Sequence, residues 1–194
     1  MAGKVAVMII DMQEEFFYDP FVSCSAEFHE LIKANQDICH WAKINKVPAI
    51  VVEMSGWGNT LSELKKQIQV PYFRIKKKKC SVFKEDNQNE IQVLKQLGIE
   101  TLLIGGISSG ACIKLTIEDA LPYFSIILPD NAHAGINGKR IVFHKDYPYS
   151  DLGPVSSCLG LIDAARISPE AYEAYKAKIL ASQLPPCPSP TLVR

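Results

Sequence analysis

Short apolar runs that alternate with amphipathic segments constrain the fold of this chain most strongly. Val5–Ile10 is an unbroken apolar run that ends at Asp11, and 47–54, 101–104 and 125–128 are similar runs. Such runs are typical of strands buried on both faces of a parallel sheet. The segments between them have helical patterns, as in 25–44, where Ser25 is a suitable N-cap, and more weakly in 61–70. A short strand is predicted over 72–75. The alternation predicts βαβ units and a three-layer α/β, Rossmann-like domain, with a mostly parallel central sheet of about five or six strands.

Residues 131–163 interrupt this alternation and are rich in Gly, Pro, Tyr and Ser, with a strand expected only around 141–143. Connections of this length are uncommon unless they are functional or disordered. We therefore predict a single domain over residues 1–183 with an atypical insertion at 131–163. Ser168-Pro169-Glu170 predicts the start of a final helix, and the proline-rich segment 184–194 predicts a loose C-terminal tail.

The charge and hydropathy of the chain exclude several classes of function. Lys plus Arg total 21 and Asp plus Glu total 21, so the formal net charge is zero. A general nucleic-acid binder normally carries a basic excess, so we expect no nucleic-acid partner. No apolar run approaches the roughly 20 residues of a membrane helix, and the run at 5–10 is too short for a signal-peptide core. We therefore expect no membrane association and a cytoplasmic location.

The chain has six cysteines, and none forms a CxxC pair or a metal-ligand spacing, which predicts free thiols in a reducing compartment. Cys112 is the strongest candidate for chemistry because it follows a buried strand and a Gly/Ser-rich turn, at the predicted start of a helix. A helix N-terminus lowers the pKa of a thiol and offers backbone N–H groups to an oxyanion. The alternative is a small buried cysteine that packs the helix against the sheet.

Two charged features accompany this cysteine. Asp11 directly follows the first strand, at the edge where open α/β sheets bind ligands, although an aspartate that caps a loop gives the same pattern. The run 76–79 consists of lysines alone. It fits a solvated charged turn, or a targeting or phosphate-binding patch, and a lysine near a thiol and a carboxylate would instead stabilise a thiolate.

Three motifs, in order, resemble those of the isochorismatase-like cysteine hydrolases, which include nicotinamidases and N-carbamoylsarcosine amidohydrolases. Residues 11–16 (DMQEEF) resemble the D-x-Q-x-x-F opening of that family, and residues 77–83 (KKKCSVF) resemble its K-x-x-x-S-x-F segment. Residues 97–112 resemble its L-G-I-x-x-L-x-x-x-G-x-x-T-x-x-C block, with Ser109 in place of the usual Thr, and the pair Asp119-Ala120 follows as in the family. The resemblance runs from about residue 5 to residue 130.

This resemblance implies a catalytic triad of Asp11, Lys77 and Cys112. Asp11 would take the thiol proton, Cys112 would attack an amide-like carbonyl, and Lys77 would stabilise its charged partners. Within the lysine run, only the spacing to Ser81 and Phe83 selects Lys77. Water would hydrolyse the acyl-enzyme, and no organic cofactor is implied.

The resemblance also implies a cis peptide bond between Ile107 and Ser108. That bond would direct the N–H group of Ser108, with that of Cys112, at the oxyanion. Phe16, Trp57 and Ile107 would line the substrate pocket, since the family builds its pocket from these segments. The family commonly forms dimers or tetramers, so we expect a homo-oligomer.

The chain departs from the family at the metal site. Family members that hydrolyse nicotinamide carry an Asp and two His for a metal after the second strand, whereas the corresponding segment 52–59 contains Glu53 and no histidine. We therefore predict no metal. Family members that cleave isochorismate commonly lack the nucleophilic cysteine, so the presence of Cys112 favours amide chemistry. His133 and His144 lie in the unmatched segment, where contact with the pocket stays open.

These observations predict a cysteine hydrolase that acts on a small amide, carbamoyl or related C–N substrate through a thioester. The alternative from another class is a non-catalytic binding or scaffold protein that uses 131–163 as its interaction surface. A third hypothesis is that the protein is redox-responsive and uses an exposed thiol such as Cys80 or Cys187.

Overall fold

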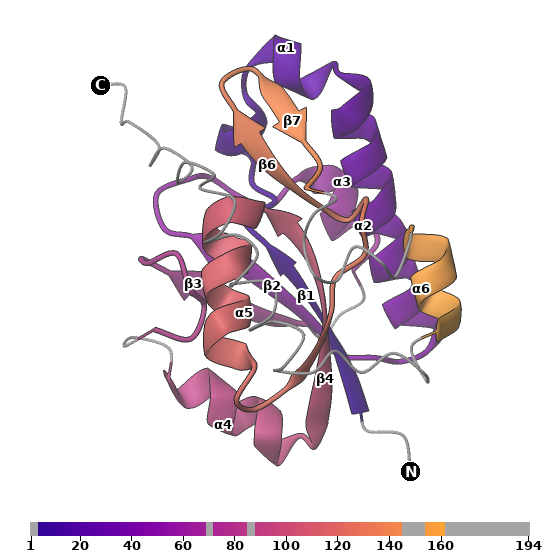
Figure 1. The fold of residues 1–194 in the computed structure, drawn as a ribbon, viewed down its shortest axis with the longest axis vertical. Coiled ribbons are helices and arrows are strands. Elements are labelled where there is room, and N and C mark those ends of the chain that lie inside the picture. Colours follow the sequence, from indigo (N-terminus) through magenta and orange to yellow (C-terminus); the bar gives the residue numbers. More distant parts are fainter. Residues whose placement is uncertain (1–3, 69–71, 85–87, 145–153, 162–194) are drawn as a thin grey trace, which may run out of the picture.

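A computed structural model describes residues 4–68, 72–84, 88–144 and 154–161 of the chain. A seven-stranded sheet forms its centre, with the strand order β3-β2-β1-β4-β6-β7 and with β5 paired to β4 beside this path (Figure 1). Paired strands are parallel except for β6 and β7. The predicted fold class is therefore confirmed. The strands are β1 (Lys4–Ile10), β2 (Ala49–Met54), β3 (Phe73–Lys77), β4 (Ile99–Ile107), β5 (Ser125–Ile127), β6 (His133–Asn137) and β7 (Arg140–Val142).

Helices cover both faces of the sheet, and each face has its own hydrophobic cluster. Helices α4 and α5 contribute to one cluster, and helices α2, α3 and α6 contribute to the other (Figure 1). No helix among the described residues is both long and apolar enough to cross a membrane. The helices are α1 (Pro20–Ser23), α2 (Ala26–Ile44), α3 (Ser62–Lys65), α4 (Gln88–Gln96), α5 (Lys114–Ala120) and α6 (Val155–Leu161), with a 3-10 turn at Glu14–Phe17.

The register of the parallel strands places their carboxyl ends side by side. Ile10 of β1 pairs with Val52 of β2 and with Gly106 of β4. Met54, the last residue of β2, pairs with Lys77, the last residue of β3. Residues that directly follow these strands therefore meet at one edge of the sheet, which is where open α/β sheets place their ligand sites.

The local predictions hold for the long elements and shift for the short ones. The helix predicted over 25–44 is α2, and Ser25 Oγ accepts a hydrogen bond from Phe28 N at 3.1 Å as an N-cap. Of the helix predicted over 61–70, the described residues 61–68 contain only the single turn α3. The strand predicted over 72–75 continues to Lys77, so this lysine lies within β3 and not in the turn after it.

The segment after residue 131 differs from the sequence-based expectation. One strand near 141–143 was expected there, but β6 and β7 form a hairpin, and β6 joins the main sheet beside β4. The sheet thereby exceeds the expected number of strands. The reason is composition: β6 reads HAGIN, with a buried His133 and small residues in place of an apolar run.

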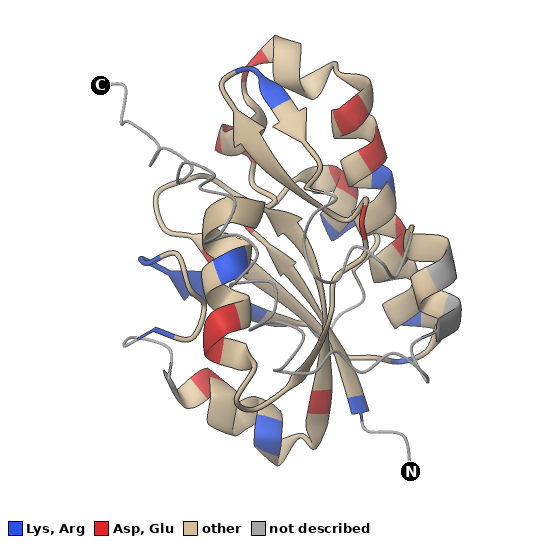
Figure 2. Cartoon of the chain, in the orientation of Figure 1, with Lys and Arg blue, Asp and Glu red and all other residues tan. Residues whose placement is uncertain are grey.

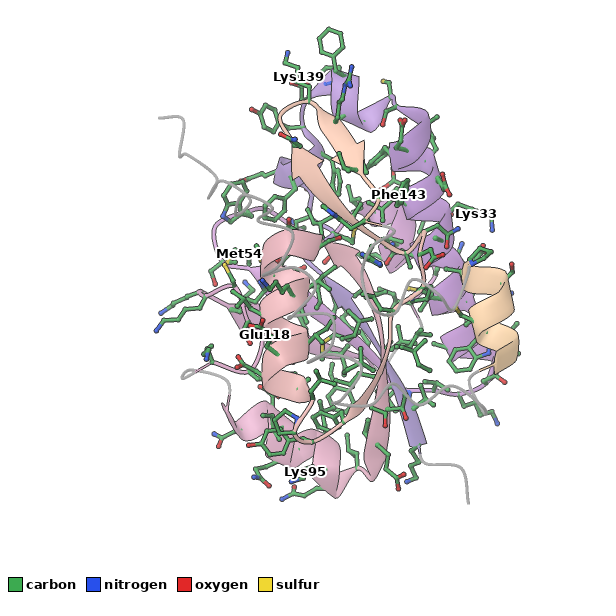
Figure 3. All side chains as sticks on the ribbon, viewed as in Figure 1. Lys33, Met54, Lys95, Glu118, Lys139 and Phe143 are labelled. Atoms are coloured by element: carbon green, nitrogen blue, oxygen red, sulfur yellow. The ribbon has the colours of Figure 1, made fainter. Side chains whose placement is uncertain are left out.

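Side-chain contacts hold this hairpin against neighbouring helices. Figure 3 shows Lys139 at the hairpin turn beside α1 and Phe143 near α2, after β7. Lys139 Nζ lies 4.6 Å from the centre of the Phe21 ring, and Phe143 packs on the α2-side cluster. The remaining parts of the predicted insertion at 145–153 and 162–163, the helix predicted from Ser168, and the 184–194 tail lie outside the described residues.

Candidate active site

Asp11 lies at the centre of the candidate site, directly after β1. Its backbone has φ of 55°, a left-handed conformation that aspartate tolerates better than most residues. Asp11 N donates to Val52 O at 3.0 Å, and Asp11 O accepts from Gln13 N at 2.8 Å, so the chain turns out of the sheet at this residue. The Asp11 side chain is only 1% exposed.

Lys77 is equally buried, at 1% exposure, and its ammonium group contacts Asp11 directly. Lys77 Nζ donates to Asp11 Oδ2 at 2.7 Å and to Cys80 O at 2.8 Å. A buried ammonium without a counter-ion costs several kcal/mol, so this pairing accounts for the buried position. The other lysines of the run are exposed: Lys76 lies on the outward face of β3, and Lys78 and Lys79 follow the strand. Figure 2 shows basic residues on and beside β3.

Cys112 lies in a π-helical turn, Ser109–Ile113, between β4 and α5. The Ile107–Ser108 peptide bond that precedes this turn is cis, at the bond that the resemblance indicates. Cys112 is 7% exposed and belongs to the same hydrophobic cluster as Ile10 at the end of β1. The fold thus brings the thiol from the end of β4 toward the residues that follow β1 and end β3.

The electrostatics of Cys112 differ from the sequence-based expectation. Burial raises the pKa of the thiol to about 12, the Asp11 carboxylate adds to this, and the positive charge of Lys77 opposes it only in part. The expected lowering of the thiol pKa is therefore wrong, because desolvation and Asp11 outweigh the positive charge of Lys77.

Asp11 is placed to exchange a proton with that thiol. Burial raises the pKa of Asp11, although the charge of Lys77 and contact with the Cys112 thiol oppose this. Lys77 donates to Asp11 Oδ2, whereas Asp11 Oδ1 has no hydrogen-bond donor among the described residues. A buried oxygen without a donor costs free energy until a proton or a ligand satisfies it. The arrangement suits a carboxylate that accepts a proton during a reaction.

Two of the predicted pocket residues stack on each other. The rings of Phe16 and Trp57 have centroids 4.4 Å apart and planes that differ by 2°. Both are partly exposed. Ile107, the third predicted pocket residue, is 1% exposed and belongs to the hydrophobic cluster against which Phe16 packs. The structure therefore pairs the two aromatic residues and places Ile107 within the core beneath this region.

Gln13 is a site residue that the sequence-based reasoning left without a role, although it is the Gln of the D-x-Q motif. It is fully buried. Its Nε2 donates to Met54 O at 3.0 Å and to Gly58 O at 2.9 Å, and its Oε1 accepts from Met54 N at 2.7 Å. Gln13 therefore ties the chain after Asp11 to the loop that carries Trp57.

Glu53, the acidic residue of segment 52–59, is occupied by protein donors. Its Oε2 accepts from Arg74 Nε at 2.8 Å and from Arg74 Nη2, and its Oε1 accepts from Thr60 N at 3.1 Å and Thr60 Oγ1 at 2.8 Å. Burial raises the pKa of Glu53, but the hydrogen bonds from Arg74 and Thr60 outweigh burial and hold it below its ordinary value. Across the described residues, no three or more His, Cys, Asp or Glu side chains are grouped so that they could hold a metal ion.

His133, which the sequence left open, lies directly behind the cysteine turn. It is fully buried, and its Nδ1 lies 2.9 Å from Ser109 Oγ. Burial, with a smaller contribution from His144, lowers the pKa of His133 to about 3, so the imidazole is neutral at physiological pH. No signal in the sequence linked His133 to Ser109, because the contact depends on the position of β6 beside β4.

Comparisons with known structures agree with this fold. The chain is similar to the MAR1 ribonuclease from Caenorhabditis elegans, with a TM-score of 0.64, 17% identity and 98% of each chain covered. An isochorismatase-like hydrolase from Alkaliphilus metalliredigens has a TM-score of 0.63 and 20% identity, covering 81% of this chain and 98% of that one. N-carbamoylsarcosine amidase from Thermoplasma acidophilum has a TM-score of 0.59 and 20% identity, covering 70% and 87%. At these identities the likeness shows the fold alone.

Sequence comparison assigns the family. No curated protein sequence matches the chain significantly. The family model described as the isochorismatase domain matches residues 5–142, which extends through β7 and beyond the motifs that end near residue 130. Because this match covers most of the chain and includes Asp11, Lys77 and Cys112, the protein belongs to the isochorismatase family, and this membership supports a hydrolase function.

Proposed function

We propose that the protein is a cysteine-dependent hydrolase that cleaves a small amide, carbamoyl or related C–N substrate through a thioester acyl-enzyme. The observation that carries this proposal is the buried contact between Asp11, Lys77 and Cys112 at the carboxyl edge of the sheet. The three groups come from the ends of three different strands, and each is at most 7% exposed. Burial of a carboxylate, an ammonium and a thiol together has a cost that a structural role alone does not require.

In the acylation step, Asp11 takes the thiol proton as Cys112 Sγ attacks the substrate carbonyl carbon. The carbonyl electron pair moves to oxygen, and the backbone N–H groups of Ser108 and Cys112 stabilise the resulting oxyanion. Collapse of this intermediate breaks the C–N bond, and the protonated Asp11 gives its proton to the departing nitrogen. A carboxyl with a raised pKa suits this second transfer, because an amine leaves poorly until it is protonated.

Deacylation repeats the same proton transfers with water. Asp11 accepts a proton from a water molecule as the water oxygen attacks the thioester carbonyl. The C–S bond breaks, the acid is released, and the proton returns from Asp11 to the sulfur. The cycle consumes one water molecule and restores the starting protonation state.

Lys77 acts as a fixed positive charge in this proposal. Its hydrogen bonds to Asp11 Oδ2 and Cys80 O fix the direction of the ammonium group. The Lys77 charge favours both the thiolate and the Asp11 carboxylate, so it stabilises the negative charge on whichever of the two groups carries it. Lys77 therefore stabilises the charged partners and does not itself exchange a proton.

The choice of a small C–N substrate rests on two supporting points. The Phe16–Trp57 stack provides a flat apolar wall, and Gln13, two residues after Asp11, donates a hydrogen bond to Gly58 O next to Trp57. N-carbamoylsarcosine amidase is among the solved structures that share the fold. A compact planar amide or carbamoyl group suits such a wall, and its leaving nitrogen suits the proton held by Asp11.

The direct test is ammonia or amine release from a panel of primary amides, N-carbamoyl amino acids and ureas. We expect the wild-type protein to hydrolyse at least one member of the panel. The control variant Cys24→Ala should hydrolyse it equally, because Cys24 is an exposed cysteine at the C-terminal end of α1. Cys112→Ala should abolish hydrolysis, and Asp11→Asn should lower kcat about 10³-fold. Intact-mass analysis during turnover should detect the acyl group on Cys112.

Two results would contradict the proposal. One is hydrolysis that persists in Cys112→Ala. The other is no hydrolysis of any amide, N-carbamoyl compound or urea, together with Cys112-dependent cleavage of a labelled RNA, which is tested because a structural neighbour is described as a ribonuclease. If the wild-type protein cleaves none of the substrates and Cys112→Ala retains the biological role, the binding or scaffold function would be favoured.

A further inference from the structure

The turn that carries Cys112 is held from outside by strand β6. Gly106 of β4 pairs with His133, and Ile107 pairs with Ala134, so β6 lies beside the last residues of β4 before the turn. Gly106 N also donates to Ala132 O at 2.8 Å. The backbone of β6 therefore fixes the point from which the turn starts.

A side-chain hydrogen bond then joins β6 to the turn itself. His133 Nδ1 and Ser109 Oγ are 2.9 Å apart, and both residues are fully buried. Ser109 is the first residue of the π-helical turn that contains Cys112. Within the turn, Ala111 N and Ile113 N both donate to Ser108 O. The His133–Ser109 contact is thus a link between the sheet and the first residue of this turn.

The support behind His133 is itself tightly packed. Asn35 of α2 is fully buried, and its Nδ2 donates to Leu31 O at 2.8 Å and to Ala132 O at 2.9 Å. A Cβ on Gly105 would lie 2.3 Å from Asn35 Oδ1, so a side chain at that position would displace Asn35. The segment that leads into His133 is therefore held by a helix on one side and by β4 on the other, which leaves little room for movement.

We propose that His133 is a positioning residue for the nucleophile, which holds the Cys112 turn in register with Asp11 and Lys77 through Ser109 Oγ. This inference rests on the proposed function, because it explains how that site is kept in its reactive geometry. Small displacements of a nucleophile reduce rate strongly even when substrate binding is retained.

The test compares variants that remove the hydrogen bond with variants that keep it. His133→Leu and Ser109→Ala remove one partner each. In His133→Asn, the side-chain amide reaches the place of Nδ1, and Ser109→Thr keeps the hydroxyl. We expect His133→Leu and Ser109→Ala to lower kcat about 10- to 100-fold with KM changed less than about threefold. His133→Asn and Ser109→Thr should retain most of the wild-type activity.

The double variant gives a second readout. If the two residues act as one unit, His133→Leu combined with Ser109→Ala should lower kcat no further than the worse single variant. A multiplicative loss, or a rise in KM with kcat unchanged, would overturn the inference. If His133→Leu does not fold, Ser109→Ala carries the test, since it removes a single oxygen atom.

A measurement without substrate separates this inference from the proposed function. The rate of Cys112 alkylation by iodoacetamide is followed against pH in wild type, Ser109→Ala and the control Ser62→Ala, an exposed serine. A loosened turn relieves the burial and the Asp11 contact that raise the pKa of the Cys112 thiol. The pH midpoint of the alkylation rate should therefore fall by about one pH unit or more in Ser109→Ala, and it should not change in Ser62→Ala. An unchanged midpoint would contradict the positioning role even if no hydrolysable substrate is found.

Discussion

Asp11 and Glu53 are both buried carboxylates that contact a basic side chain, but their pKa values move in opposite directions. Burial raises the pKa of Asp11 despite Lys77. Burial also acts on Glu53, but Arg74 and Thr60 outweigh it and lower the pKa. The difference lies in the balance between burial and the groups that oppose it: at Asp11 burial outweighs Lys77, Cys112 and Met54, whereas at Glu53 the donors Arg74 and Thr60, which occupy both oxygens, outweigh burial. A buried carboxylate whose two oxygens both accept hydrogen bonds stabilises the structure, whereas a carboxylate oxygen without a hydrogen-bond donor is available to accept a proton.

The largest expected effect separates these two carboxylates by activity. Asp11→Asn should lower kcat about 10³-fold, because the amide cannot accept the thiol proton. Glu53→Gln should retain activity within about tenfold, because Glu53 contacts the loop and not the thiol. Steady-state kinetics on the best panel substrate measure both. Equal losses in the two variants would show that Asp11 has no special role.

The pH profile sharpens the same contrast. Because the pKa of Asp11 is raised, protonation of Asp11 should remove activity on acidification at a pH above the ordinary value of 3.8. This acidic limb of kcat/KM should stay in place in Glu53→Gln, since the pKa of Glu53 is shifted the other way. If the midpoint of the acidic limb of kcat/KM shifted in Glu53→Gln, the assignment of this limb to Asp11 would be contradicted.

The next prediction concerns Lys77 and Arg74, the basic residues that pair with Asp11 and Glu53. Lys77→Met should lower the free energy of unfolding by about 3 kcal/mol at neutral pH, because it leaves the Asp11 charge buried without a partner. The loss should shrink in acid, where Asp11 is protonated. Arg74→Met, the matched control, should cost only about 1 kcal/mol, since Arg74 is 42% exposed and water replaces part of the contact. Chemical denaturation at several pH values measures these differences.

Glu53→Gln gives a smaller loss of stability, which also disappears as the pH falls. A carboxylate whose pKa is lowered by folding stabilises the protein above its unfolded pKa of 4.5, and this contribution is lost as the pH falls through the folded value. The variant should therefore be less stable than wild type by about 1 kcal/mol at neutral pH and equal to it in strong acid. A difference that grows in acid would contradict this account.

The parts of this molecule that could be predicted from sequence are those with a local signal. The apolar runs identified β1 and β4, and the motifs at their ends located Asp11 and Cys112. Within β3, Ile75 and Lys77 are buried between exposed neighbours, but Phe73 at the same spacing is exposed, so the alternation is incomplete. In the sequence, only the spacing to Ser81 and Phe83 selected Lys77.

The rest depends on tertiary contacts that leave no local pattern. Strand β6 is short and rich in small residues, so nothing in its periodicity reveals that it places His133 against Ser109. The pKa of Cys112 depends on how deeply the turn is buried and on the charge beside it, so reasoning from the helix start alone gave the wrong direction. Position along the chain indicates where a reactive group lies, but burial decides its protonation state.

The smallest expected effect comes from Lys78→Ala, and it tests the selection of Lys77 within the lysine run. Lys78 follows Lys77 directly, but its side chain is exposed. Its removal should change kcat less than about twofold and the free energy of unfolding by less than about 0.5 kcal/mol. The charge of the run falls equally in Lys78→Ala and Lys77→Met, so a purely electrostatic contribution of this basic edge would affect both variants alike. Activity lost in Lys77→Met and retained in Lys78→Ala would assign the effect to the buried contact with Asp11, and the reverse pattern would contradict the proposed site.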